Sequence, residues 1–235
     1  MEVTVVGAGY VGLSVSVGIA SKVNSVTCVD VDEEKVDKIN KGEPPIYEES
    51  MEELLNEVLD KELLRAATDI EEAIKDASII FITVGTPMKE DGSIDLSIVK
   101  QAVEDVGGAL KEKDNYVVVT VKSTVVPRTT NDEIIPILED RSGKKAGEDF
   151  GVCMNPEFLR EGKAISDFLN PDRIVIGELD EKSGDLLESL YEEFDAPILR
   201  MGLSSAEMVK YASNSFLANK ISFINEIGNI CKQLG

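Results

Sequence analysis

Short apolar runs alternate with amphipathic stretches along this chain. The runs are rich in valine and isoleucine and predict buried strands, at residues 2–6, 26–30, 77–84, 116–121 and 150–154. Stretches between them carry apolar residues at helical spacing and predict helices, at about residues 33–40, 49–60 and 96–110. Because strands and helices alternate through residue 153, we predict an α/β fold built on a doubly wound parallel sheet with right-handed crossovers.

The carboxyl-terminal part continues this pattern and then changes. Two further strands with a helix between them are predicted, at 174–177, 197–200 and 182–193. From Leu203 onward the chain has no proline and no glycine before Gly228, which predicts one long helix capped near the two serines that follow Leu203. At roughly 1.5 Å per residue, such a helix outreaches a single domain. We therefore expect a domain of residues 1–200 and a connecting or dimerisation helix of residues 201–235.

The first predicted strand runs directly into Gly7-Ala8-Gly9-Tyr10-Val11-Gly12, and a helical pattern follows. In a dinucleotide-binding turn, Gly7 makes the tight turn, Gly9 lets the backbone approach a pyrophosphate, and Gly12 lets the helix pack on the strand. The second strand ends in Asp30, 23 residues after Gly7, where a carboxylate binds the adenine ribose hydroxyls and repels a 2′-phosphate. The sequence therefore predicts a Rossmann-like domain that binds NAD in preference to NADP. The alternative is a plain strand-to-helix turn with a capping acid.

Residues 155–162 set two carboxylates, Glu157 and Glu161, on a loop behind the apolar run 150–154, where Pro156 interrupts regular structure. The carboxyl ends of strands in an α/β sheet are where ligands bind, so this loop is the main candidate for a substrate site. The alternative is a proline turn with two solvated acids.

Two other features extend the candidate site. Gly85-Thr86-Pro87 ends the strand 77–84, and such a turn can lie against the nicotinamide-side ribose or be an ordinary turn. Lys210 and Asn214 are four residues apart on the long helix and share one face. The alternative for Lys210 is a solvated lysine, as most lysines are.

The charge balance limits which partners the protein can have. The 235 residues include 45 acidic and 24 basic side chains, and the net charge of −21 argues against binding nucleic acid or an anionic membrane. An anionic small ligand must then be held by helix amino termini and a few fixed Lys or Arg side chains. There is no histidine, and the three cysteines have no metal-ligand spacing, so we expect no metal site. No apolar run approaches the roughly 18 residues that span a bilayer, so we expect a cytoplasmic protein without a signal peptide or membrane segment.

Taken together, these residues resemble the UDP-glucose 6-dehydrogenase family, within the nucleotide-sugar dehydrogenases. The resemblance runs along essentially the whole chain and rests on Gly7 to Gly12, Asp30, Gly85-Thr86-Pro87, Lys122-Ser123-Thr124-Val125, Asn155 to Gly162, Asn170 to Gly177, and the helix from Lys210 to Asn214. The segment 155–162 looks like the UDP-glucose and GDP-mannose branches, and 167–173 looks most like UDP-glucose enzymes.

The resemblance implies NAD-dependent oxidation of the C6 alcohol of UDP-glucose to UDP-glucuronate, in two hydride transfers through an aldehyde and a cysteine thioester. It implies that Lys210 and Asn214 stabilise negative charge on the C6 oxygen. Glu157 would assist proton transfer and hydrolysis, and Thr124 would position water. The implied substrate-binding residues are Glu157, Phe158, Leu159, Arg160, Lys210 and Asn214. The implied NAD-binding residues are Gly7, Gly9, Tyr10, Val11, Gly12, Asp30, Lys35, Gly85, Thr86, Ser123, Thr124 and Glu161.

The family's nucleophilic cysteine is expected some tens of residues beyond Lys210, and none of the three cysteines fits that place. Cys28 and Cys153 fall within predicted strands, and Cys231 lies at the wrong distance. We therefore expect the NAD domain and central helix of such an enzyme, without the UDP-binding domain, forming a homodimer through that helix. The alternatives are another nucleotide-sugar dehydrogenase, such as one for GDP-mannose, and a non-catalytic NAD-binding or dimerising module.

Overall fold

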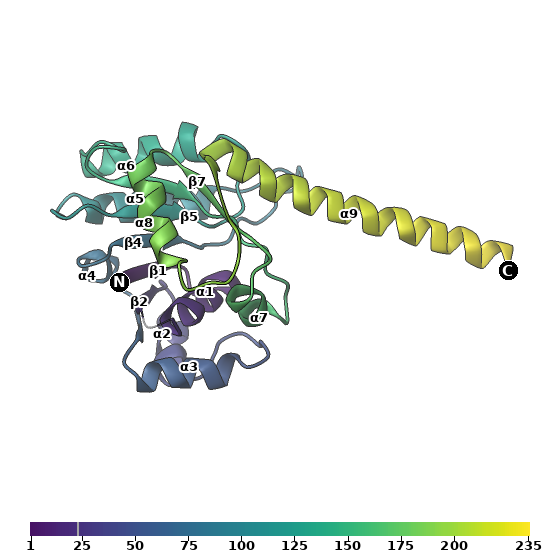
Figure 1. Cartoon of the computed structure of the whole chain (residues 1–235), viewed down its shortest axis with the longest axis horizontal. Coiled ribbons are helices and arrows are strands. Elements are labelled where there is room, and N and C mark those ends of the chain that lie inside the picture. The colour runs from purple at the N-terminus through teal and green to yellow at the C-terminus, as the bar shows by residue number, and fades with distance from the viewer. Residues whose placement is uncertain (23) are drawn as a thin grey trace.

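The core of the computed structural model is an eight-stranded sheet that lies between two layers of helices (Figure 1). The structure describes residues 1–22 and 24–235. The strands are β1 (Glu2–Val6), β2 (Ser25–Val29), β3 (Leu64–Ala67), β4 (Ile79–Ile82), β5 (Val118–Val121), β6 (Gly151–Met154), β7 (Ile174–Glu178) and β8 (Ile198–Gly202). They lie in the order β3-β2-β1-β4-β5-β6-β7-β8. Every predicted strand is confirmed, and β3 is a further short strand that the hydropathy pattern did not reveal.

The direction of the strands changes once across the sheet. The strands from β1 to β6 pair in parallel, and all of them except the edge strand β3 are largely buried on both faces, as helices on both sides require. β7 runs antiparallel to β6, with Met154 opposite Gly177, and β8 is parallel to β7. The prediction of a parallel sheet is thus confirmed for six strands, while the last two run the other way. Because of this reversal, β7 enters the sheet from the edge at which β6 ends, and its first residues lie beyond Met154.

Helices cover both faces of the sheet, as the doubly wound arrangement predicts. They are α1 (Tyr10–Ala20), α2 (Glu33–Asn40), α3 (Met51–Asp60), α4 (Ile70–Ile74), α5 (Ser97–Leu110), the π-helical turn η1 (Thr130–Ile134), α6 (Ile135–Ser142), α7 (Ala164–Leu169), α8 (Glu181–Leu190) and α9 (Leu203–Leu234). One apolar cluster includes Leu13 of α1 and Leu187 of α8, and the other includes Val103 of α5 and Leu138 of α6. The two clusters are the two layers of the core.

Helix α7 was not predicted, and a glycine accounts for its position against α1. A Cβ on Gly18 would lie 2.2 Å from the ring of Phe168, so only glycine lets the two helices approach this closely. The ring of Phe168 also packs edge-on against Phe194, with 5.6 Å between ring centroids. These contacts hold α7 directly behind the loop 155–162, where it supports the candidate site.

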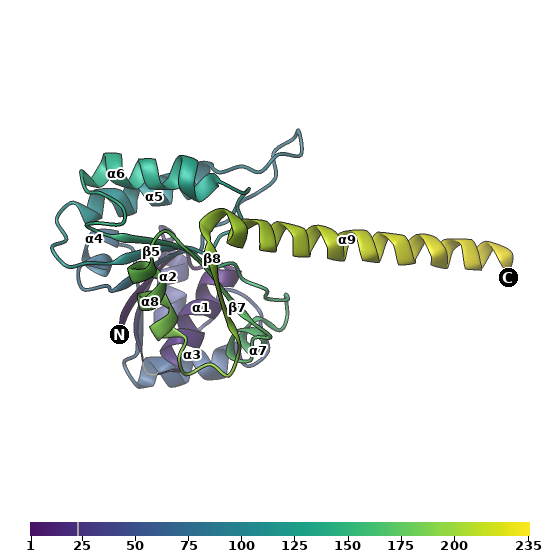
Figure 2. The same cartoon turned by 45° about the horizontal axis from the view of Figure 1, so that its top comes forward.

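Helix α9 leaves the sheet domain as a long rod (Figures 1 and 2). Its 32 residues make it about 48 Å long at the usual rise per residue. Gly202 is its N-cap, so the two serines expected near the cap lie in the first turn. Its buried residues, from Leu203 to Lys210, all lie in the first two turns, and the rest of the helix is largely exposed. Among the described residues, no helix has both the length and the apolar character needed to cross a membrane. The division of the chain at residue 200 stays a prediction.

Candidate active site

The predicted site residues gather at one edge of the sheet. Strands β1, β4, β5 and β6 are adjacent and parallel, so the residues that follow their carboxyl ends meet there. These are the glycine turn after β1, Gly85 after β4, Ser123 after β5 and Asn155 after β6. The strand order reverses between β1 and β4, and this is the place where a doubly wound sheet opens a crevice for a ligand.

The glycine turn has the geometry that a dinucleotide needs. Gly7 has a φ of +103°, and a Cβ on Gly12 would lie 1.7 Å from the carbonyl oxygen of Gly7. A Cβ on Gly9 would meet no described atom within 4 Å, so a ligand can approach the backbone here. Helix α1 begins at Tyr10, and no side chain of the described residues caps its first amides. Uncapped amides at a helix terminus fit the phosphates of the cofactor.

Asp30 follows β2 and is tied to this turn. The N–H of Ala8 donates to its Oδ2 at 2.7 Å, and the N–H of Asp32 donates to its Oδ1 at 3.0 Å. A carboxylate offers about four acceptor positions, so two remain for ribose hydroxyls. The ammonium of Lys35 lies 3.6 Å from Oδ1. Asp30 thus holds the turn in place and still offers oxygens to a ligand.

The other predicted cofactor residues lie along the same edge. Ser123 is buried and donates its hydroxyl to the carbonyl oxygen of Val84 at 2.6 Å, which joins the ends of β4 and β5. Thr86 and Thr124 are half-buried, and Glu161 is exposed. Their contact with a cofactor stays a prediction.

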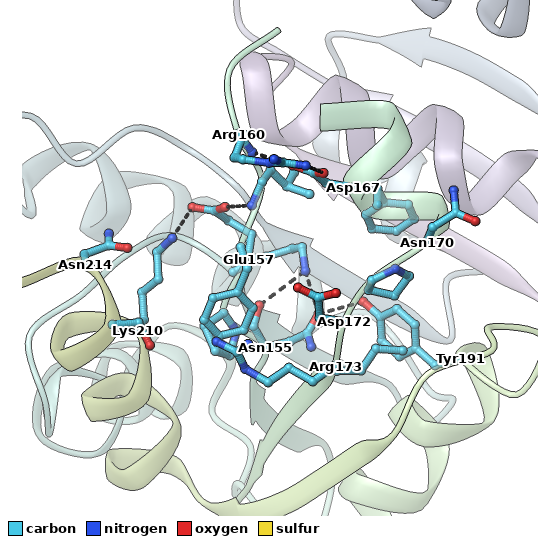
Figure 3. A pocket seen from close by; sticks show the side chains of 18 of the residues that line it. Asn155, Glu157, Arg160, Asp167, Asn170, Asp172, Arg173, Tyr191, Lys210 and Asn214 are labelled. Atoms are coloured by element: carbon cyan, nitrogen blue, oxygen red, sulfur yellow. Dashed lines mark hydrogen bonds and ion pairs between the residues drawn. The ribbon is translucent and has the colours of Figure 1, made fainter. Parts of the chain in front are cut away.

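A pocket of about 480 Å³ opens between the loop after β6 and the first turns of α9 (Figure 3). Its volume is that of a small-molecule site. All the predicted substrate residues line it: Glu157, Phe158, Leu159, Arg160, Lys210 and Asn214. The segment 170–173 also lines it, because the reversed β7 enters the sheet from the edge at which β6 ends. Four lining side chains are basic and three are acidic, in a chain whose net charge is −21.

Lys210 and Glu157 form an ion pair in this pocket (Figure 3). The Nζ of Lys210 lies 2.7 Å from Oε1 of Glu157, and their side chains are only 7% and 14% exposed. The other carboxylate oxygen of Glu157 accepts the N–H of Leu159 at 2.6 Å, so the side chain is held from its own loop. Asn214 stands one turn beyond Lys210 on the same face of α9. A held ammonium, carboxylate and amide in one pocket can stabilise negative charge on an oxygen and move a proton.

Two arginines shape the wall of the pocket. Arg173 stacks its guanidinium over the ring of Phe158, 4.2 Å from the ring centroid. Arg160 pairs with Asp167, with Nη2 at 2.6 Å from Oδ1, and these hydrogen bonds hold the pKa of Asp167 below its ordinary value. The loop after β6 is thus attached to α7 on one side and to the segment before β7 on the other.

Lys122 and Asn155 lie in motifs for which the sequence predicts no role of their own, and no sequence pattern points to Tyr191. The Nζ of Lys122 donates to Oδ1 of Asn155 at 2.7 Å, and the hydroxyl of Tyr191 donates to the same oxygen at 2.6 Å. The amide of Asn155 donates in turn to the carbonyl oxygen of Val175 at 2.8 Å. This buried network ties the start of the loop to β5, β7 and the end of α8. A lysine directly after an apolar strand was the one sequence signal for it.

Burial lowers the pKa of Lys122 to about 7, with Glu157 acting in the opposite direction. In the unfolded chain this lysine keeps its proton to about pH 10.4. Between these values the unfolded state binds more protons, so Lys122 contributes stability that increases as the pH rises. We expect the free energy of unfolding of the wild type, minus that of Lys122→Met, to rise with a slope of up to about 1.4 kcal/mol per pH unit between about pH 7 and pH 10.

Urea denaturation of both proteins at several pH values measures this slope. Lys232→Met is the matched control, because Lys232 is exposed near the end of α9. Its difference from the wild type is expected to stay flat over the same range. A flat difference for Lys122→Met as well would contradict the lowered pKa.

Glu207 is another buried residue whose role no sequence pattern predicts. Its carboxylate is 0% exposed and accepts the N–H of Arg128 at 2.5 Å and both the N–H and hydroxyl of Thr130, at 2.8 Å and 2.6 Å. Arg128 has a φ of +81°, a left-handed conformation that costs a non-glycine residue roughly 1–2 kcal/mol. Glu207 lies one turn before Lys210, so it fixes α9 against the loop that carries Thr124.

Fold and site together are those of a Rossmann-type dinucleotide-binding domain with a small-molecule pocket beside its cofactor edge. Residues 1–195 match the model of the UDP-glucose/GDP-mannose dehydrogenase family, NAD binding domain, and residues 204–235 match that family's central domain. The chain belongs to the UDP-glucose/GDP-mannose dehydrogenase family, and its cofactor is NAD. The resemblance in the sequence is thereby confirmed.

Relatives of both named kinds are similar to the whole of this chain. It is 46% identical over 235 residues to a GDP-mannose 6-dehydrogenase of Pseudomonas syringae and 45% identical over 235 residues to a UDP-glucose 6-dehydrogenase of Bacillus subtilis. It covers 54% and 52% of those proteins, so the chain spans about half the length of the curated relatives it matches. A crystal structure of a ternary complex of GDP-mannose dehydrogenase from Pseudomonas aeruginosa superposes with a TM-score of 0.98 at 46% identity, over 100% of this chain and 54% of that one. The expected preference for UDP-glucose stays a prediction.

Proposed function

We propose that this chain supplies the NAD-binding half and one wall of the substrate site of an enzyme that oxidises the C6 alcohol of a nucleotide sugar. The single observation that carries the proposal is the Lys210–Glu157 pair, 2.7 Å apart in a pocket beside the cofactor edge. Bound NAD supplies the hydride acceptor. The residues of this chain bind and orient the substrate, stabilise the charge that develops on it and transfer its protons.

Each pocket residue has a distinct task in this proposal. The ammonium of Lys210 and the amide of Asn214 stabilise the charge that develops on the C6 oxygen as its proton leaves. Glu157 holds Lys210 in place and is the carboxylate that exchanges protons, while Thr124 positions water. Removing hydride from an alcohol needs such charge stabilisation, because the alcohol oxygen carries negative charge when the C–H bond breaks.

The thiols of the sheet domain do not serve as the family's nucleophile. Burial raises the pKa of Cys28 to about 11 and that of Cys153 to about 12, so neither is a thiolate at neutral pH. Both lie within strands, away from the pocket wall. The steps from aldehyde to acid therefore need a thiol other than these two.

The substrate is proposed to be UDP-glucose, with GDP-mannose as the alternative. An anionic diphosphate is attracted to the basic side chains of the pocket in an otherwise strongly acidic chain. The segment 167–173 favours UDP-glucose, whereas relatives of both substrate classes match at almost equal identity. A direct binding comparison decides between them.

Calorimetric titration of residues 1–235 with NAD, followed in the same cell by UDP-glucose or GDP-mannose, tests the proposal. We expect saturable NAD binding that is at least about tenfold tighter than NADP binding, because Asp30 repels a 2′-phosphate. Binding of one nucleotide sugar in addition supports the pocket as substrate site and identifies the base. The proposal is contradicted if NAD does not bind. If NAD binds but neither nucleotide sugar gives a heat of binding, residues 1–235 do not bind the substrate, and that part of the proposal is contradicted.

We also propose that the exposed part of α9 packs against a second copy of the chain. Its apolar side chains are exposed, including Phe216 at 70%, Phe223 at 65% and Ile224 at 60%. Such a surface on a rod about 48 Å long is larger than a soluble monomer usually leaves in water. Light scattering of residues 1–235 is expected to give twice the chain mass. A monomer at all concentrations would mean that another segment or protein covers this face.

A further inference from the structure

Glu48 lies outside the pocket, in the segment between α2 and α3, and no sequence pattern predicts a role for it. It is 6% exposed, and a buried carboxylate is costly unless it is hydrogen-bonded. Its Oε1 accepts the N–H of Gly162 at 2.7 Å, and its Oε2 accepts the N–H of Ala164 at 2.8 Å. Gly162 has a φ of +82°, a conformation that suits glycine, and Ala164 begins α7. Glu48 therefore holds the end of the loop 155–162.

Tyr10 attaches the glycine turn to the same end of this loop. It is the first residue of α1, directly after Gly9, and its hydroxyl donates to the carbonyl oxygen of Arg160. Burial, and after it the neighbouring Glu48 carboxylate, raise the pKa of Tyr10 above its ordinary value, so the phenol keeps its proton. The segment that faces the cofactor phosphates is thus bonded to a residue of the substrate pocket.

The loop is therefore held at two points with the reactive carboxylate between them. At its start, Asn155 is fixed by Lys122 and Tyr191. At its end, Glu48 and Tyr10 hold residues 160–164. The position of Glu157 relative to the glycine turn depends on both attachments.

We propose that Glu48, acting with Tyr10, is a positioning residue that links the NAD-binding turn to the loop carrying Glu157, so that cofactor binding orders the substrate side of the site. Phosphates held by the turn restrain Tyr10, and Tyr10 restrains the carbonyl of Arg160. Glu48 makes this restraint effective, because it keeps the following residues from moving away. The inference rests on the proposed function, since it needs NAD to bind at this turn.

Hydrogen exchange of residues 1–235, measured by mass spectrometry with and without saturating NAD, tests the link. In the wild type we expect NAD to slow exchange in peptides covering residues 157–164 by about fivefold or more. In Glu48→Gln one end of the side chain becomes a donor and cannot accept both N–H groups. We expect this variant to bind NAD within about threefold of the wild type by calorimetry and to show no NAD-dependent protection of the loop.

Two other variants complete the experiment. Glu49→Gln makes the same charge change at the next residue, which is exposed, and is expected to keep the wild-type protection. Tyr10→Phe removes only the hydroxyl donor and is expected to lose the NAD-dependent protection of the loop. If Glu48→Gln fails to fold, this variant alone tests the link. A loss of stability alone would speed exchange with and without NAD and leave the effect of NAD intact.

The outcomes separate this inference from the proposed function. If the wild type binds NAD and the loop is not protected, or if Glu48→Gln and Tyr10→Phe keep full protection, the link is overturned while the cofactor site stands. If the wild type binds no NAD, the proposed function fails first and the link with it. If the link holds, NAD is expected to raise the affinity for the nucleotide sugar by about fivefold or more in the wild type.

Discussion

Lys210→Met is expected to lower kcat for the nucleotide-sugar oxidation proposed above by about a hundredfold or more. The methionine keeps the bulk of the side chain and removes the charge that is proposed to stabilise the substrate oxygen. It also leaves Glu157, whose side chain is 14% exposed, without its cation. The dissociation constant of NAD is expected to change by less than about threefold, because the glycine turn is a separate part of the site. Steady-state kinetics and calorimetry measure the two quantities.

Lys220→Met on the same helix is the matched control. Lys220 is exposed and lies ten residues beyond Lys210, so its removal is expected to leave kcat within about twofold of the wild type. An unchanged kcat in Lys210→Met would take Lys210 out of the chemistry. Equal losses of kcat in both variants would mean that the intact helix α9, and not the charge of Lys210, is what the activity requires.

Glu207→Ala is expected to lower the free energy of unfolding by about 3 kcal/mol or more. The change leaves the N–H of Arg128, and the N–H and hydroxyl of Thr130, without their acceptor. Each unsatisfied buried donor costs about 1–3 kcal/mol. The left-handed conformation of Arg128 also loses the contact that holds it. Urea denaturation followed by far-ultraviolet circular dichroism measures the loss.

Glu226→Ala is the control for this change, because Glu226 is exposed on the projecting part of α9. It is expected to alter the free energy of unfolding by less than about 0.5 kcal/mol. A loss below about 1 kcal/mol for Glu207→Ala would mean that water replaces the carboxylate without penalty.

The parts of this molecule that could be predicted are those in which local geometry dictates the residue type. Gly12 has to be glycine because a Cβ there would overlap the carbonyl of Gly7. Asp30 ends a strand at the spacing that the dinucleotide fold requires, and the apolar strands show their burial in their composition. Lys210 and Asn214 could be paired because helical spacing places them on one face.

The parts that could not be predicted depend on contacts between distant segments. Tyr191 looks like any aromatic residue at the end of an amphipathic helix, and its role appears only when Asn155 lies beside it. Glu48 and Glu207 look like two of the 45 acidic side chains, and their burial follows from backbone amides that tertiary structure brings to them. The reversal of β7 has no signal in the hydropathy pattern, because a buried strand looks the same in either direction.

That reversal separates two parts of the protein that tolerate sequence change differently. Because β7 returns beside β6, the chain between them, residues 155–173, leaves and re-enters the sheet at one edge. Away from Asn155, Glu157 and residues 160–164, which fixed contacts hold, exchanges and insertions in such an excursion cost little closure entropy and leave the strand order intact. The cofactor edge has no such freedom, since its turn tolerates only glycine at the critical positions. New preferences for the sugar or base of the proposed substrate can therefore arise within one short segment of the gene, while the NAD-binding edge stays the same.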